Sequence, residues 1–289
     1  MRYGGNTSCL EVRLGDGTLL VLDAGTGIHP LGLELGSDVP RTIHLLLTHL
    51  HFDHLEGLGF FAPLWVAETD LHVWGPPSPV RSLDERIARY LSPPLFPVQL
   101  SDVPAQMTSH DVPDEEWEIG SARLLAQPVS HPGPTVGYRL SEDGHSLAYI
   151  PDHEPALGVD LWTVAPEWMS GHALAEGVDF LLHDSQYSED EYPARAGWGH
   201  SSVEQAVAFA RISNARQLVM FHHDPDHDDE HLEGLLRRGR ELWGDEGELP
   251  LLAFEGMELE LFLTGSGKSR MRDPRSPGWR GFEDRARSG

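Results

Sequence analysis

The feature that most constrains this chain is a group of metal-binding residue types directly after an apolar segment. Residues 43–47 read IHLLL and predict a buried strand, and they are followed by His49, His51, Asp53 and His54. Alternate residues at the end of an extended segment point to one side, so His49 and His51 can hold one ion. We expect Asp53 and His54, where the chain turns into the next helix, to hold a second ion. Imidazoles and carboxylates without a thiolate suit zinc, manganese or iron.

Further polar residues stand where later strands are expected to end. Strands predicted at residues 122–129, 146–150, 178–182 and 217–221 lead to His131, Asp152, Asp184 and His222. Helices are predicted at residues 55–64, 81–91, 161–175, 203–215 and 228–243. This alternation predicts stacked sheets with helices outside and one site along an edge.

The histidine and aspartate string resembles the signature of the metallo-β-lactamase superfamily, over about residues 3–263. The resemblance implies one α/β domain at residues 1–264, an αββα sandwich of two mixed sheets with outer helices. It implies two divalent ions, with zinc the expected metal and manganese or iron the alternatives. The implied ligands are His49, His51, His131 and Asp152 for the first ion, and Asp53, His54, His222 and Asp152 for the second.

Three positions near this ligand set have more than one interpretation. His223 is the alternative to His222, which we prefer because it directly follows the apolar strand. Asp23, after the strand predicted at residues 18–22, either braces a metal-binding histidine or closes a turn. Glu154 either touches substrate or packs behind the ligands.

A second motif narrows the reaction. The segment HDSQ at residues 183–186, followed by GHSSVEQA at 199–206, resembles the Gly-His-Ser-Thr segment of the phosphodiesterase branch. That branch includes tRNA 3′-end-processing endonucleases and phosphoribosyl cyclic phosphate phosphodiesterases. The resemblance implies that His200 acts as a general acid or transition-state donor with Asp184 orienting it. Asp53 completes the predicted catalytic set, and a histidine near a helix start is the structural alternative for His200.

The predicted function is metal-dependent hydrolysis of a small phosphodiester, cyclic ones included. Two neighbouring ions lower the pKa of a shared water and withdraw charge from the attacked group. The alternatives are hydrolysis of an ester, thioester or lactone at the same dinuclear site, or a metal-dependent sensor without turnover.

The charge of the chain sets the expected partners. The net charge of −25 argues against affinity for nucleic acid or an anionic membrane, so a small-molecule substrate is expected. Cys9 is the only cysteine, and we find neither a secretory signal nor an apolar run of membrane-spanning length, which predicts a cytoplasmic protein. The oligomeric state stays open, a homodimer included.

Two remaining segments are expected to lie at the surface. Residues 265–289 carry seven basic against three acidic residues and few apolar ones, which predicts a basic, flexible tail. His227 and His231 lie four residues apart beside Asp226, Asp228 and Asp229, which is typical of an acidic helix start.

Overall fold

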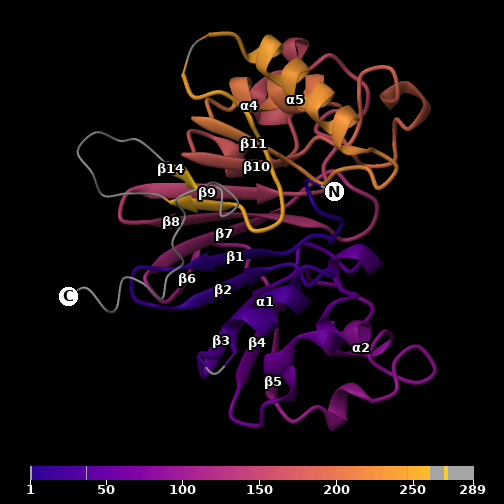
Figure 1. The fold of residues 1–289 in the computed structure, drawn as a ribbon, viewed down its shortest axis with the longest axis vertical. Coiled ribbons are helices and arrows are strands. Elements are labelled where there is room, and N and C mark those ends of the chain that lie inside the picture. The colour runs from indigo at the N-terminus through magenta and orange to yellow at the C-terminus, as the bar shows by residue number, and fades with distance from the viewer. Residues whose placement is uncertain (1, 37, 246, 261–269, 273–289) are drawn as a thin grey trace.

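Two mixed β-sheets form the centre of the computed structural model, which describes residues 2–36, 38–245, 247–260 and 270–272 (Figure 1). The first sheet has the order β1-β2-β3-β4-β5, with β1 antiparallel to β2 and the others parallel. Its strands are β1 (Leu10–Arg13), β2 (Leu19–Leu22), β3 (Thr42–Leu46), β4 (Asp70–Gly75) and β5 (Gln106–Asp111).

The second sheet has the order β12-β11-β10-β9-β8-β7-β6, antiparallel from β6 to β9 and parallel from β9 to β12. Its strands are β6 (Trp117–Ile119), β7 (Ala122–Pro128), β8 (Val136–Glu142), β9 (His145–Ile150), β10 (Phe180–Asp184), β11 (Gln217–Phe221) and β12 (Leu251–Leu252). The predicted sandwich of two mixed sheets with outer helices is confirmed.

The helices cover the outer faces of the sandwich (Figure 1). They are α1 (Ile28–Leu35), α2 (Leu83–Ala88), α3 (His172–Ala175), α4 (Val203–Ile212) and α5 (Asp229–Trp243). Strand β3 shows why the strands need both faces covered: Ile43 and Leu45 pack in the apolar cluster that includes α1, whereas Leu46 packs between the sheets. A strand buried on both faces reads as a continuous apolar run, as residues 43–47 do.

Two predicted helices are wrong in form. Residues 55–64 form two 3₁₀ turns, Leu58–Phe60 and Ala62–Trp65, and residues 161–175 form two more 3₁₀ turns followed by the short α3. Pro63 and Pro166 stand at the starts of such turns, where each removes an N–H that a continuing helix would need.

Most of the predicted basic tail, residues 265–269 and 273–289, lies outside the described residues. The exception is β14 (Arg270–Arg272), which pairs antiparallel with β13 (Glu258–Glu260). Among the helices that the structure describes, none is long and apolar enough to cross a membrane.

Candidate metal centre

Strand ends from both sheets meet at one edge of the sandwich. Parallel strands deliver the residues that follow them to the same side, and the carboxyl ends of such strands commonly build sites. Asp23 follows β2 and His49 follows β3, while Asp152, Asp184 and His222 lie at the ends of β9, β10 and β11. His131 follows β7, which runs the same way as β9 because both are antiparallel to β8. All of the site residues predicted from the sequence therefore lie at this edge.

The string of histidines after β3 forms a tight turn. The residues Phe52–His54 make a 3₁₀ turn, in which the His54 N–H donates to the His51 carbonyl. The turn lies against the loop that follows β2, since the Ala24 N–H donates to the His54 carbonyl. Gly57 makes this approach feasible, because a Cβ there would lie 2.0 Å from the Gly25 carbonyl oxygen. The expected α-helical start is thus a 3₁₀ turn, which still directs Asp53 and His54 toward the strand ends.

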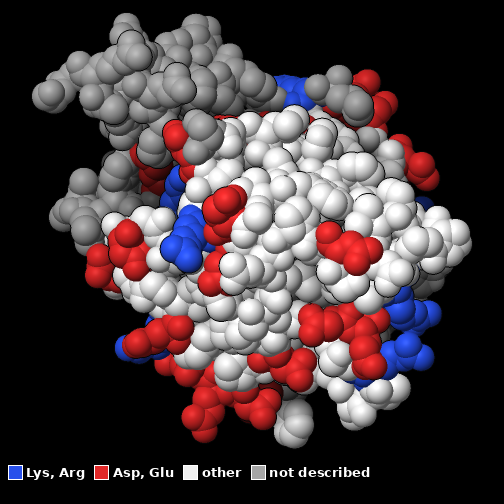
Figure 2. Space-filling view, turned by 90° about the horizontal axis from the view of Figure 1, so that it is seen from below, with Lys and Arg blue, Asp and Glu red and all other residues white. Residues whose placement is uncertain are grey.

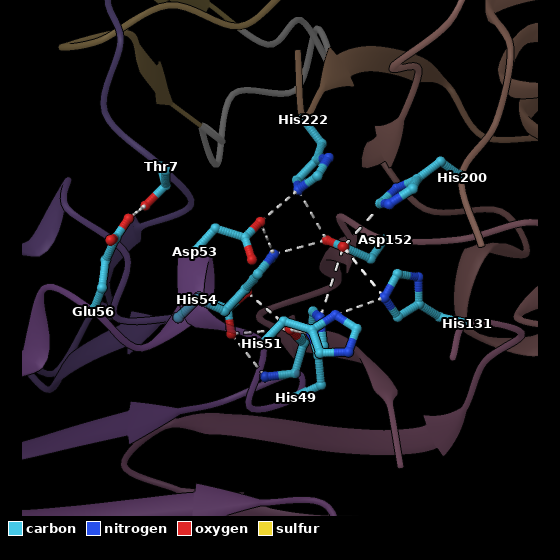
Figure 3. Close-up of polar contacts among 12 residues, drawn as sticks. Thr7, His49, His51, Asp53, His54, Glu56, His131, Asp152, His200 and His222 are labelled. Carbon is cyan, nitrogen blue, oxygen red and sulfur yellow. Dashed lines mark hydrogen bonds and ion pairs between the residues drawn. The ribbon is translucent and has the colours of Figure 1, made fainter. Parts of the chain in front are cut away.

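The predicted ligands form two neighbouring groups, with Asp152 between them (Figure 3). The first contains His49, His51 and His131, and the second contains Asp53, His54, Asp152 and His222. Within each group the candidate ligand atoms all lie within 4.8 Å of one another.

The two oxygens of Asp152 face different groups. Its Oδ2 lies 3.7 Å from His49 Nε2 and 3.6 Å from His131 Nε2. Its Oδ1 lies 2.9 Å from His54 Nε2 and 3.4 Å from His222 Nε2. This carboxylate can therefore contact two cations at once.

Asp23 fixes the orientation of two of these histidines. Its carboxylate can only accept, so His54 must donate through Nδ1, at 2.8 Å. Thr48 donates its hydroxyl to Asp23 and consequently accepts from His49 Nδ1, at 3.0 Å. Both Nε2 lone pairs are thereby directed at the centre. Of the two interpretations of Asp23, the structure supports the bracing of a candidate ligand.

His131 is oriented by a loop that Glu154 holds in place. His131 Nδ1 donates to the Gly199 carbonyl at 2.8 Å. The fully buried Glu154 carboxylate accepts from the Gly197 and Gly199 N–H groups and from the Tyr192 hydroxyl, at 2.6–3.0 Å. Glu154 therefore positions the loop that leads into His200. Of its two interpretations, packing behind the ligands is the one that this arrangement supports.

The electrostatics of the centre match a cation. Burial strongly disfavours charge on His49 and lowers its pKa to about 2, which keeps that ring neutral and able to bind a metal. Burial also lowers the pKa of His54, but Asp152 and Asp23 outweigh it and hold that pKa well above its usual range. Burial raises the pKa of Asp152, and the surrounding histidines outweigh it and keep the carboxyl ionised.

Unpaired buried atoms provide a direct test of whether metal ions fit. His49 Nε2, His54 Nε2 and Asp152 Oδ1 are fully buried and make no hydrogen bond of good geometry, although His54 Nε2 and Asp152 Oδ1 lie only 2.9 Å apart. Leaving such atoms unpaired is costly unless something else binds them. Imidazole nitrogens and carboxylate oxygens that converge in this way fit divalent metal ions.

His200 and Asp184 adjoin the centre. His200 Nδ1 donates to Asp184 Oδ2 at 2.7 Å, and its ring stacks on His222 with the centroids 5.1 Å apart. Asp184 is fully buried and also accepts from the His153, Gln186 and Ser201 N–H groups. The aspartate is therefore rigid and fixes the direction of the His200 ring.

The structure separates His222 from its neighbour His223. His222 Nε2 lies 3.3 Å from Asp53 Oδ2, whereas His223 Nε2 bonds to the Ala253 carbonyl, away from the centre. His222 has a φ of 60°, a conformation that costs a non-glycine residue energy and that recurs at functional sites.

A cavity of about 450 Å³ lies beside His49 and His51. Its other walls come from Phe52, from α2 and the residues after it, and from residues 132–134. Arg86, Arg89 and Tyr90 also line it, and the Arg86 guanidinium donates to the Pro76 carbonyl at 2.7 Å. The sequence indicated a helix at residues 81–91 but contained no signal that it borders the metal centre.

Comparisons with known proteins identify the class. A family model described as a β-lactamase superfamily domain matches residues 18–223, and together with the fold and the metal-binding groups this defines the class. The chain belongs to the metallo-β-lactamase superfamily.

The most similar relatives carry the same name. Ribonuclease Z of Myxococcus xanthus is 27% identical over 286 residues, covering 85% of this chain and 89% of the relative. Ribonuclease Z of Porphyromonas gingivalis is 25% identical over 271 residues, covering 78% and 85%.

Solved structures share the fold. The metallo-β-lactamase fold protein YhfI of Bacillus subtilis superposes with a TM-score of 0.64 at 18% identity, covering 94% of this chain and 96% of that one. A diphosphatase of the PhnP family gives 0.63 at 21% identity, covering 89% and 85%. The short form of human tRNase Z gives 0.56 at 19% identity, covering 77% and 89%.

These comparisons confirm several predictions. The superfamily is confirmed by the family model, and the ribonuclease Z relatives agree with the predicted phosphodiesterase and tRNA-processing branch and with a metal-dependent hydrolase of the phosphodiesterase type. Divalent metal ions are confirmed as the class of cofactor.

The predicted partners are wrong. The expectation of a small-molecule substrate, with the charge arguing against nucleic acid, conflicts with relatives that are ribonucleases. The net charge describes the whole chain and does not determine the electrostatic field at the site. Acidic side chains are scattered over the molecular surface (Figure 2), whereas Arg86 and Arg89 lie at the cavity itself. An approaching phosphate is governed by the local field, which metal ions would make positive.

Proposed function

We propose that this chain is a dinuclear metal-dependent phosphodiesterase that cleaves a phosphodiester bond in RNA. The observation that carries the proposal is Asp152, whose two oxygens face two separate groups of ligand atoms. The proposed ligands are His49, His51, His131 and Asp152 for one ion and Asp53, His54, His222 and Asp152 for the other.

Zinc is the proposed metal because imidazole nitrogen and carboxylate oxygen form the entire ligand set. When bound, two such ions would activate water as a nucleophile and neutralise charge on the attacked phosphate. The protein prepares the ligands through Asp23, Thr48 and the Gly199 carbonyl, which hold three imidazoles in the correct tautomer.

His200 is the proposed proton donor to the leaving oxygen. Asp184 accepts from His200 Nδ1 and stabilises the charged ring, so Nε2 can release its proton as the phosphorus–oxygen bond breaks. The attacking water forms the new bond to phosphorus and supplies the proton that restores His200. We propose that Asp53, whose Oδ2 lies 3.3 Å from both His54 and His222, also orients that water.

The cavity beside His49 and His51 is the proposed site for a nucleotide of the substrate. Its volume of about 450 Å³ falls within the range of small-ligand pockets. Phe52 is 62% exposed and meets Tyr90 edge to face at 5.5 Å, which offers an aromatic surface to an unstacked base. Arg89 would pair with a backbone phosphate. The ribonuclease Z relatives support the same substrate class.

The test uses the zinc-loaded chain with three substrates: an end-labelled tRNA precursor with a 3′ extension, bis-(p-nitrophenyl) phosphate and a simple lactone. We expect cleavage of one bond in the RNA, loss of it in His200→Ala and wild-type rates in the remote control His145→Ala. Hydrolysis of the small phosphodiester with intact RNA would overturn the RNA assignment. Hydrolysis of the lactone alone would overturn the phosphodiesterase.

A further inference from the structure

Glu191, His227 and His231 form a third group of metal-binding side chains, outside the centre described above. Glu191 lies in the loop between β10 and α4, His227 lies just before α5, and His231 lies in the first turn of α5. The candidate ligand atoms of the three residues lie within 4.8 Å of one another. The sequence had suggested only an acidic helix start here, because Glu191 is far away along the chain.

Local hydrogen bonds preorganise the carboxylate. Glu191 Oε2 accepts from the Ser188 N–H and hydroxyl, both at 2.8 Å, and Oε1 lies 2.9 Å from His227 Nε2. Burial raises the pKa of Glu191, but the bonds from His227 and Ser188 outweigh it and lower that pKa to about 2. The carboxylate is therefore ionised and fixed at neutral pH.

The two histidines are held as neighbours on the helix start. The Asp228 side chain caps α5 and accepts from the His231 N–H at 2.8 Å, which fixes the backbone of the first turn. The imidazole rings stack with centroids 3.8 Å apart and an angle of 18° between their planes.

The contact between Glu191 and His227 does not involve all of the polar atoms of this group. His231 Nε2 lies 3.9 Å from Glu191 Oε2, too far for a hydrogen bond, and the His231 side chain is 41% exposed. The His227 side chain is only 6% exposed, and its Nδ1 is buried without a hydrogen-bond partner. A cation reaching the group from solvent can be bound by a carboxylate and two imidazoles, a ligand set typical of zinc.

We infer that Glu191, His227 and His231 form a third divalent-cation site, separate from the dinuclear centre and independent of the proposed substrate. The ion would join two segments that border the centre. Glu191 directly precedes Tyr192, whose hydroxyl donates to Glu154, the carboxylate that holds the loop leading to His200. His227 lies five residues after His222. The site would therefore brace both segments without contacting the reacting phosphate.

The experiment counts zinc ions per chain by titration of the metal-free full-length protein, followed by gel filtration and elemental analysis. Wild type is expected to retain three equivalents and His231→Ala two, with the half-buried control His145→Ala retaining three. Glu191→Gln is the second variant, and it should also retain two. Two equivalents in all four proteins would overturn the inference and leave the dinuclear centre unaffected.

A second readout distinguishes a metal site from a mere change in the fold. Trypsin cleavage after Arg195, in the loop that carries Glu191, should slow when zinc is added to wild type in excess of two equivalents. The same addition should leave the cleavage rate of His231→Ala unchanged. Equal zinc protection of both proteins would exclude a role of this group in holding the loop.

Discussion

Replacing Asp23 with asparagine should weaken one metal ion and spare the other. The asparagine oxygen should stay with the Thr48 N–H, which Asp23 Oδ1 now accepts at 2.7 Å. The amide NH₂ then takes the place of Oδ2, opposite His54 Nδ1 and the Tyr149 hydroxyl. Because an amide nitrogen donates rather than accepts, His54 is forced to move its proton to Nε2, the atom that faces Asp152.

The size of the effect follows from the bonds that change. Loss of an orienting partner typically lowers metal affinity by about 10- to 100-fold, or roughly 1.4–2.7 kcal/mol. We expect this loss at the ion bound by His54. His49 should keep its tautomer, since Thr48 can still donate to the asparagine oxygen. The metal-free variant should also lose about 1.5–3 kcal/mol of stability, the contribution of a hydrogen bond to a charged group.

The assay is a competition titration of zinc between metal-free protein and a chromophoric chelator, which resolves the affinities of the individual ions. The matched control is Asp179→Asn, which alters a carboxylate that accepts from the Ser146 N–H at 2.9 Å far from the centre. If Asp23→Asn binds both ions as tightly as wild type, or weakens both equally, the tautomer argument is refuted.

Four further predictions follow from the same structure. His200→Ala should lower kcat by about 100- to 10,000-fold while both ions of the centre are retained, as measured by kinetics and metal analysis. Glu154→Gln places an NH₂ group against the Gly197 or Gly199 N–H, so thermal unfolding should show a loss of about 1–3 kcal/mol. Burial and repulsion from His72 lower the pKa of His44 to about 4 from an ordinary value of 6.5, so the unfolded chain binds the extra proton between these pH values. Stability should consequently fall as the pH drops from 6.5 to 4, and the pH dependence of His44→Phe measured by denaturant titration should be flatter. Chelation should lower the Tm of wild type by more than that of Asp152→Ala, because loss of the shared carboxylate weakens both ions of the centre and with them the stabilisation that they supply.

The sequence predicted the positions of the ligands because each strand end is encoded locally. An apolar run followed by histidine or aspartate predicts both a buried strand and a polar residue at its end, and His49, Asp152 and His222 all follow this rule. The fold class followed from the same alternation of strands and helices together with the resemblance.

The remaining features depend on contacts between distant segments. Asp23 contacts Thr48 and Tyr149, and the three residues belong to three different strands or the loops that follow them. No local pattern in the sequence distinguishes this arrangement from a simple turn at Asp23. Arg86 reaches the cavity only because α2 lies beside the metal centre. The total charge of the chain gives no information about this local position. The helix predicted at residues 161–175 failed because the apolar spacing was right but Pro166 interrupted it.

The division of the ligands between the sheets has a consequence for the synthesis of the protein. The segment after β3 supplies His49, His51, Asp53 and His54, whereas His131, Asp152 and His222 follow strands of the second sheet. A nascent chain therefore carries only part of the set until residue 222 has left the ribosome and β11 has joined its sheet. Incomplete or cleaved chains would lack part of the candidate ligand set, so both sheets must assemble before the proposed centre is complete.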